Sequence, residues 1–385
     1  MTTTSSIRGR MALMAGHCAG MVDLVALPIW VGVLVAHYRF DPQQAGLLAS
    51  LFLVGAVLAS LWVAPRFNRL SGRLVATVGF GVTAAGFTFA STTSAFGPLA
   101  LVHGLCGLAA GAALSVTHGT VARSGQPHRL FAMLGIALSL FAIVFVAATP
   151  SLVAKAGGPA LFMVFAGVML VGAVAAAVAF PRPEGGAVEG PSVSEGPFPR
   201  AVWFGIVGIS CMSLVQAMTF SFLERVANGR GFSPQAIHGV LVAIGLVALA
   251  PPVLAALLER RLSARSVMMA GPLLQAALCI VVMNSQDFMP YAVAACLFAP
   301  VMIFTHVFTF GLLARLDPSG RAMAATPAMV MLGAAIGPFL GGTLVKSFGY
   351  GAIGAAALGI GVVAAAAFSR LPRTTPSVVT TGVAA

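Results

Sequence analysis

The chain has 385 residues, of which 59% are hydrophobic and 8% are charged, with 21 basic and 9 acidic side chains. A soluble domain of this composition would lack the polar surface needed to cover its apolar residues, which excludes soluble enzymes, secreted disulfide scaffolds and disordered chains. The basic residues stand singly between long apolar runs, so the positive charge does not indicate nucleic-acid binding. The composition predicts an all-α polytopic membrane protein.

Twelve segments are long and apolar enough to cross the hydrocarbon core, which takes about 20 residues in a helix. In chain order they are residues 11–36, 44–64, 74–93, 97–122, 130–153, 158–180, 201–224, 235–258, 266–284, 288–314, 322–346 and 350–369. The long connection 181–200 is rich in proline, glycine and glutamate, as linkers are. We therefore expect an N-terminal six-helix bundle in residues 1–180, a linker in 181–200 and a C-terminal six-helix bundle in 201–385.

The positions of lysine and arginine predict the orientation, because cytoplasmic loops carry an excess of both. With a cytoplasmic N-terminus, 16 basic residues fall on the cytoplasmic side and 5 on the opposite side. The five are Arg39, Lys155, Arg225, Arg230 and Lys346. We therefore expect both termini and the linker to be cytoplasmic, in a protein of the bacterial inner membrane.

An internal repeat relates the two halves at one constant offset of 192 residues. The matching segments are 40–43 with 232–235, 69–73 with 261–265, and 117–129 with 309–321. A single ungapped offset over three separated segments indicates a duplicated six-helix unit.

Three short motifs accompany the repeat. The loop from Pro65 to Leu74 reads PRFNRLSGRL, with Gly72 and Arg73 near its end. The fourth span contains HGLCG, starting at His103, and the eleventh contains GAAIGPFLGG in residues 333–342. Together with the six-plus-six arrangement, these segments resemble the major facilitator superfamily. In its antiporters a G-x-x-x-G-P-x-x-G-G motif lies in the fifth helix, whereas here the similar segment lies in the eleventh span.

The resemblance implies a fold in which two six-helix pseudo-repeats surround a central cavity and rock to expose it to either side. It also implies that the first, fourth, seventh and tenth helices line the cavity. The partners it implies are the lipid bilayer, a small-molecule substrate and protons, with no nucleic acid and a functional monomer. No cofactor and no metal are expected.

Asp23 is the one acidic residue placed near the middle of a predicted span. An ionised carboxylate there costs at least a few kcal/mol, so burial favours a carboxyl group that takes up a proton near neutral pH. We predict that Asp23 couples protons or binds substrate; the alternative is a structural hydrogen bond between helices. His103 is the expected partner of Asp23. The alternative is that His103 is anchored near the outer lipid headgroups. Trp30 lies on the same helix face as Asp23. It is expected to form the floor of the substrate pocket or to anchor the helix at the membrane–water interface.

Three further polar residues lie on helices that the resemblance places along the cavity. Gln216 is in the seventh span, and His306 and Thr309 share a face of the tenth. We predict that they contact substrate; the alternative is hydrogen bonding between helices. His17 is expected to pack between helices, and His118 to be solvated.

The loop motifs supply the predicted gating residues. Gly72 and Arg73 lie in the first repeat, and Arg265 lies in the equivalent loop of the second. Glu259 and Arg260 precede Arg265 and keep an acid in that loop. In the eleventh span, Gly337 and Pro338 form the centre of the glycine-proline motif.

The function predicted from all this is secondary active transport of a small organic solute by alternating access, coupled to protons, with efflux slightly favoured. Proton-coupled uptake of a small solute or metabolite is the alternative, with facilitation without protons third. A membrane enzyme is disfavoured because no H-E-x-x-H or comparable group exists. A receptor or scaffold is disfavoured because no large extramembrane domain is predicted in the sequence. Transport driven by ATP bound to this chain is also excluded. It would require a P-loop, in which glycine precedes the lysine, but Val345 precedes Lys346.

Overall fold

The computed structural model describes residues 3–182, 199–258, 261–316 and 326–372. Within these ranges, twelve helical segments are long and apolar enough to cross a membrane. This confirms the predicted number of spans and the all-α membrane fold. Large apolar side chains such as Leu101, Val178 and Leu257 are exposed on the outside of the bundle, where lipid would cover them.

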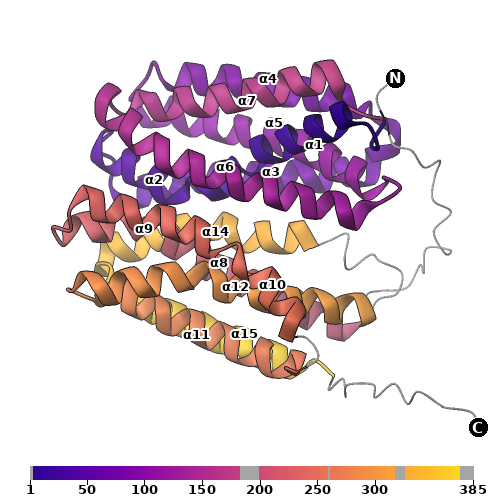
Figure 1. Ribbon diagram of the computed structural model, residues 1–385. Helices are drawn as coiled ribbons and strands as arrows, with labels where there is room; N and C mark the ends of the chain where they lie inside the picture. Colours follow the sequence, from indigo (N-terminus) through magenta and orange to yellow (C-terminus); the bar gives the residue numbers. More distant parts are fainter. Residues whose placement is uncertain (1–2, 183–198, 259–260, 317–325, 373–385) are drawn as a thin grey trace, which may run out of the picture.

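The first six spans form one bundle, drawn in indigo to magenta in Figure 1. Its helices are α1 (Ile7–Gly20) and α2 (Val22–Ala36), which together make the first span, then α3 (Pro42–Val63), the 3-10 helix η1 (Ala64–Arg69), α4 (Gly72–Ala90), α5 (Phe96–Ala122), α6 (Pro127–Ala156) and α7 (Pro159–Ala179). Prolines at the start of α6 and α7 suit the first turn, where the missing N–H has no partner to lose.

The last six spans form the second bundle, drawn in rose to yellow. They are α8 (Arg200–Gly229), α9 (Pro234–Val247) continued by α10 (Ala250–Leu258), α11 (Ala264–Asn284), α12 (Phe288–Leu316), α14 (Thr326–Phe348) and α15 (Gly351–Ser369). Equivalent helices of the two bundles start with the same cap. Ser71 Oγ accepts a hydrogen bond from Leu74 N at the start of α4, and Ser263 Oγ accepts one from Ser266 N at the start of α11.

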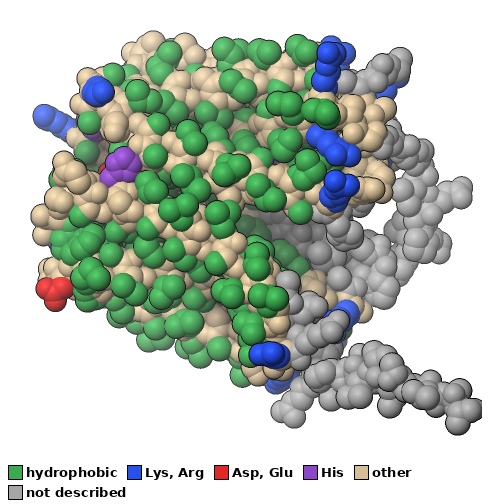
Figure 2. All heavy atoms as spheres, viewed as in Figure 1, with side chains coloured by type: hydrophobic (Ala, Val, Ile, Leu, Met, Phe, Trp, Pro, Cys, Tyr) green, Lys and Arg blue, Asp and Glu red, His purple; other side chains and the backbone are tan. Residues whose placement is uncertain are grey.

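The two ends of the molecule differ in charge and in how the bundles meet. We call the end where α1 begins and α15 ends the basic end, because most Lys and Arg side chains visible in Figure 2 lie there. We call the opposite end the distal end; it holds residues 37–41, between α2 and α3, and residues 349–350, between α14 and α15. The bundles touch through α3 with α14, α2 with α8, and α6 with α9.

The first span is bent at one point. Met21 separates α1 from α2 and has φ −108° and ψ 8°, outside the helical range. Its N–H still bonds to His17 O, so the span bends without losing its continuity. The bend lies two residues before Asp23, whereas Pro28 lies inside α2. The side chain of Asp23 therefore belongs to the first turn of α2.

Candidate functional site

The tightest junction between the bundles joins α3 and α14 in the distal half of the molecule. A Cβ added to Gly342 would lie 2.8 Å from Pro42 C and 2.9 Å from the Cα of Gln43, inside any normal contact distance. A Cβ on Gly46 would collide in the same way with the backbone of Pro338. Only glycine permits these helix backbones to approach so closely.

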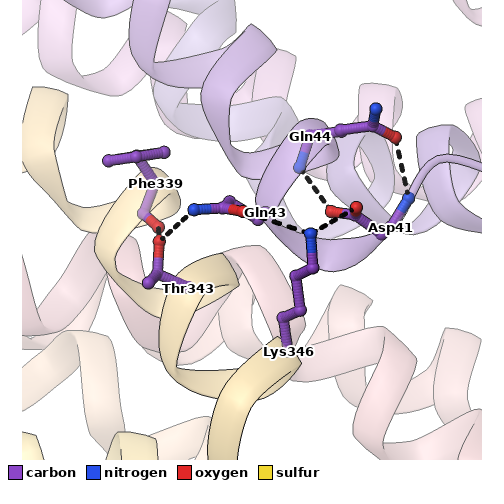
Figure 3. Close-up of polar contacts among 6 residues, drawn as sticks. All are labelled: Asp41, Gln43, Gln44, Phe339, Thr343 and Lys346. Atoms are coloured by element: carbon purple, nitrogen blue, oxygen red, sulfur yellow. Dashed lines mark hydrogen bonds and ion pairs between the residues drawn. The ribbon is translucent and has the colours of Figure 1, made fainter.

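Polar contacts close the same junction (Figure 3). Lys346 Nζ donates to Asp41 Oδ2 at 2.9 Å and to Gln43 Oε1 at 3.3 Å. Gln43 Nε2 donates in turn to Thr343 Oγ1 at 3.3 Å, so α3 and α14 are joined by a chain of hydrogen bonds. We call Asp41, Gln43, Thr343 and Lys346 the distal lock.

Asp41 is held by its own helix as well as by Lys346. Its Oδ1 accepts from Gln44 N at 2.9 Å, and its own N–H donates to Gln44 Oε1 at 3.3 Å, which is a capping box at the start of α3. Partial burial opposes ionisation of the carboxyl group. The hydrogen bonds from Lys346 and from the backbone of Gln44 outweigh it and hold the pKa of Asp41 below its ordinary value.

The glycine-proline motif of α14 has two packing faces. Gly337, with Gly333 and Gly341, packs on α8 of the same bundle; a Cβ on Gly337 would lie 2.7 Å from Met218 N. On the other face Pro338 lies against α3 of the opposite bundle. Phe339 N donates to Ser50 Oγ at 3.1 Å across the junction. The motif thus lets α14 lie between α8 and α3.

At the basic end the predicted gating arginines make contacts within their own bundles. Arg73 donates to Ala177 O at the end of α7, and Arg265 donates to Leu371 O at 2.9 Å, just after α15. Gly72 lies against the ring of Phe180. Glu259 and Arg260 lie outside the described residues. Among the described residues, the hydrogen bonds that cross between bundles all lie on the distal side of the α3–α14 junction. The molecule is therefore closed at its distal end.

Asp23 is buried on the face of α2 that packs into the first bundle. It is 1% exposed and shares its face with Ala19, Ala26 and Trp30, which are all 0% exposed. Its Oδ1 accepts a hydrogen bond from Leu24 N at 2.8 Å, whereas no described group bonds to its Oδ2. A charged carboxylate in such a place would be costly, so the uncharged, protonated form suits it better.

Trp30 and His103 lie side by side, but neither reaches Asp23. Their rings stack with centroids 5.4 Å apart, inside a cluster that includes Phe52, Phe87 and Phe165. His103 Nδ1 bonds to Leu99 O at 2.7 Å, while its Nε2 has no partner among the described residues. The expected Asp–His hydrogen bond is absent from this conformation, because seven residues, or about 10 Å of helix, separate Asp23 from Trp30. Trp30 is fully buried and so is not an interfacial anchor.

A different pair of histidines forms nearer the basic end. His17 Nδ1 and His118 Nε2 lie 2.9 Å apart, joining α1 to α5. The expectation that His17 packs between helices agrees with this contact. His118, which we expected to be solvated, is partly exposed and also packs its ring against Phe131 of α6.

The remaining predicted substrate residues are already engaged with protein. Gln216 Oε1 accepts from Gln275 Nε2 at 3.1 Å, a contact between α8 and α11. Thr309 is fully buried and donates to Thr305 O of its own helix. His306 stacks on Phe310 with centroids 5.3 Å apart, and its Nε2 lacks a partner among the described residues. For Gln216 and Thr309 the geometry favours the alternative of structural hydrogen bonding.

Comparison with known protein families identifies the fold. The sequence model of the Major Facilitator Superfamily matches residues 12–316. The chain belongs to the major facilitator superfamily. It is therefore a secondary transporter in the lipid bilayer rather than an enzyme. A search of curated protein sequences gives no match.

Solved structures of transporters share the fold at low sequence identity. The D-xylose–proton symporter aligns with a TM-score of 0.74 and 13% identity over 94% of this chain and 97% of its own. A bacterial homologue of the human lysosomal transporter Spinster, in an inward-facing and occupied conformation, aligns with 0.73 and 13% over 96% and 98%. The nucleoside transporter NupG aligns with 0.71 and 13% over 95% and 100%.

The transporter has two sets of polar residues that sequence reasoning did not single out. The first is the distal lock. Two sequence features could have indicated it: the FDPQ segment of the repeat, which contains Asp41 and Gln43, and Lys346, which is one of two lysines in the chain. The second is Glu224, which was placed at the end of the seventh span. Helix α8 continues to Gly229, so Glu224 lies inside the span. Its Oε2 is buried and unpartnered among the described residues.

Proposed function

We propose that the transporter moves a small organic solute by alternating access and that the movement is coupled to protons through Asp23. The observation that carries the proposal is the buried carboxyl group of Asp23, with one oxygen unpartnered at the bend of the first span. An intramembrane acid without a countercharge is costly and is typical of proton pathways. The bend gives the site a hinge, which is common in the discontinuous helices of transporters.

In this proposal, rocking of the two bundles exposes the solute site and Asp23 to one side of the membrane at a time. The distal end is closed in this conformation, so solute and protons would exchange at the basic end. If the basic end faces the cytoplasm, as the 16-to-5 distribution of basic residues favours, this is the inward-facing state. Reporter fusions within residues 181–200 test the orientation, and a signal from the outer side there would contradict it.

Efflux in exchange for protons is our preferred direction, because the chain length, the sparse loops and the carboxyl group in the first span resemble those of small drug/proton antiporters. Uptake together with protons is the second candidate. A specific observation favours it: the glycine-proline motif of antiporters lies here in α14, where it packs the distal junction, and not in the fifth span. Transport of a panel of small solutes in right-side-out and inverted vesicles, with an imposed proton gradient, distinguishes the two directions.

The substitution Asp23→Asn tests the coupling role, because it keeps the shape and removes the titration. We expect the variant to lose gradient-driven accumulation or extrusion while it still exchanges solute at equal concentrations. The expected loss of coupling is about 1–3 kcal/mol, the usual size of linkage between two sites. Asp287→Asn is the matched control, since Asp287 is an exposed acid before α12. If Asp23→Asn moves solute against a gradient with the parent's pH dependence, Asp23 is structural.

A further inference from the structure

Glu224 is the second acidic residue within a span of the described structure. Its side chain is half-buried and lies between the bundles, and its Oε2 atom is buried. A Cβ added to Gly32 of α2 would lie 3.3 Å from Glu224 Oε2, so the absence of a side chain at residue 32 leaves space for the carboxyl group. Asn228, one turn later on α8, makes a side-chain hydrogen bond to Glu224. Oε2 itself has no solvent contact and no described partner.

The carboxyl group faces a small cavity whose walls come from both bundles. The cavity has a volume of about 230 Å³ and is lined by residues of α2 and α6 from the first bundle and of α8 and α9 from the second. Its walls toward α6 are the apolar side chains of Pro150, Val153 and Ala154. The cavity is partly open to the distal surface, since His37 and Pro234 on its wall are exposed. If the bundles separated at the distal end, the cavity would widen and water would reach the buried Oε2 of Glu224.

Two properties of this position follow from its chemistry. While the distal end is closed, one carboxylate oxygen is desolvated without a donor, which an ionised group tolerates poorly and a protonated one tolerates well. When the distal end opens, water solvates both oxygens and the ionised form becomes favourable. The proton is therefore bound more tightly in the closed state than in the open state, and by linkage the proton stabilises the closed state.

We propose that Glu224 is a second proton-binding site of the transporter, and that release of its proton favours opening of the distal end. Gly32 lies nine residues after Asp23, about 13 Å further along the helix toward the distal end. Glu224 would thus exchange protons with the distal side, whereas Asp23 lies deeper. The proposal extends the proposed proton-coupled function and assigns the distal half of the cycle to a residue of the second bundle.

Other titratable groups surround Glu224 and must be separated from it. His37 follows α2, His238 lies on α9, and Arg225 lies beside Glu224 on α8; all three line the cavity. Tyr291 of α12 is close enough to interact with the Glu224 charge, but its hydroxyl donates to Leu223 O at 3.0 Å. Arg225 makes a side-chain hydrogen bond with Tyr350. Single substitutions of the two histidines therefore separate their contribution from that of Glu224.

A distance measurement across the distal end tests the proposal without a transport substrate. Thr92 and Gln286 are exposed residues of equivalent distal loops, one in each bundle. Thr92→Cys and Gln286→Cys, in a background with the native cysteines replaced by serine, carry nitroxide labels, and double electron–electron resonance in lipid nanodiscs gives their separation. As pH rises from about 5 to 8, we expect a long-distance population to grow, with the closed-to-open ratio falling at most about tenfold per pH unit for one linked proton.

Glu224→Gln keeps the size and the hydrogen bond to Asn228 but cannot lose a proton. We expect this variant to stay at the short distance at every pH, while Asp287→Asn, His37→Gln and His238→Gln retain the parent's response. The Asp23→Asn variant separates the role of Asp23 in coupling from the role of Glu224 in distal opening. If it loses coupled transport but keeps the pH-dependent distance change, the proposal for Glu224 is supported. The proposal is overturned if the distance in the parent does not depend on pH, or if Glu224→Gln responds to pH as the parent does. It is also overturned if either histidine variant loses the response while Glu224→Gln keeps it.

Discussion

Replacing Gly342 with alanine is expected to open the distal end, because it places one methyl group where α14 meets α3. That methyl carbon would lie 2.8 Å from Pro42 C and 2.9 Å from the Cα of Gln43. Both neighbours are backbone atoms of another helix, so no side-chain rotation can relieve the overlap. Carbon atoms ordinarily approach to about 3.5–4.0 Å, so the helices must separate by roughly 0.7 Å or more.

The cost of this separation falls on the closed state alone. Overpacking of a well-packed contact costs about 1–3 kcal/mol. The movement would also lengthen the hydrogen bond of Phe339 N to Ser50 Oγ and the contact of Lys346 with Asp41. Because the open state has no such contact, the open-to-closed ratio should rise by about 5- to 150-fold.

The labels on Thr92→Cys and Gln286→Cys report this shift directly as growth of the long-distance population at constant pH. Gly359→Ala is the matched control: it is also a glycine within a span, but a Cβ there meets nothing within 4 Å. Gly359→Ala should leave the distance distribution unchanged. If Gly342→Ala gives the same distribution as the parent while it folds and is stable, the close approach of α3 and α14 does not determine closure.

Two further predictions concern the distal lock and the aromatic cluster. Since the pKa of Asp41 is lowered in the closed protein, its contact with Lys346 is fully present above the ordinary carboxyl pKa, about 3.9, and is lost as pH falls through the lowered pKa. Lys346→Gln should therefore raise the open population by an amount that is constant between pH 5 and 8, worth roughly 0.2–1 kcal/mol, and a change that varies over that range would contradict this. Trp30→Ala should destabilise the first bundle by about 3–5 kcal/mol, measured by thermal unfolding in detergent, because Trp30 is fully buried against His103. Phe89→Ala, at an exposed position, is the control and should change the unfolding temperature little.

The membrane makes some features of this protein readable from its sequence. Backbone groups cannot remain unpaired in hydrocarbon, so each long apolar segment must be a helix, and the number of spans follows from their lengths. The constant offset between residues 69–73 and 261–265 also predicted equivalent loops. In the structure Arg73 and Arg265 make the same kind of contact, each with a carbonyl at the end of the last helix of its bundle.

The sequence did not determine which way each helix faces. In a soluble helix, polar and apolar faces separate inside from outside, but a span that touches lipid on one side and protein on the other is apolar on both. The sequence therefore placed Asp23 and His103 in plausible helices, yet only the tertiary structure decided that His103 stacks on Trp30 and leaves Asp23 unpartnered.

The contacts between the bundles were also decided only by the tertiary structure. Asp41 and Lys346 are 305 residues apart, and Gly32 meets Glu224 across the boundary between the two halves. Such pairs depend on how the two bundles dock, which involves no local sequence pattern. The sequence by itself thus determined the twelve spans and the repeat, because lipid fixes helix length and hydrogen bonding. The tertiary structure decided the closed distal end, because there Gly342 meets the backbone of Pro42, and Gly46 meets the backbone of Pro338, across the two bundles.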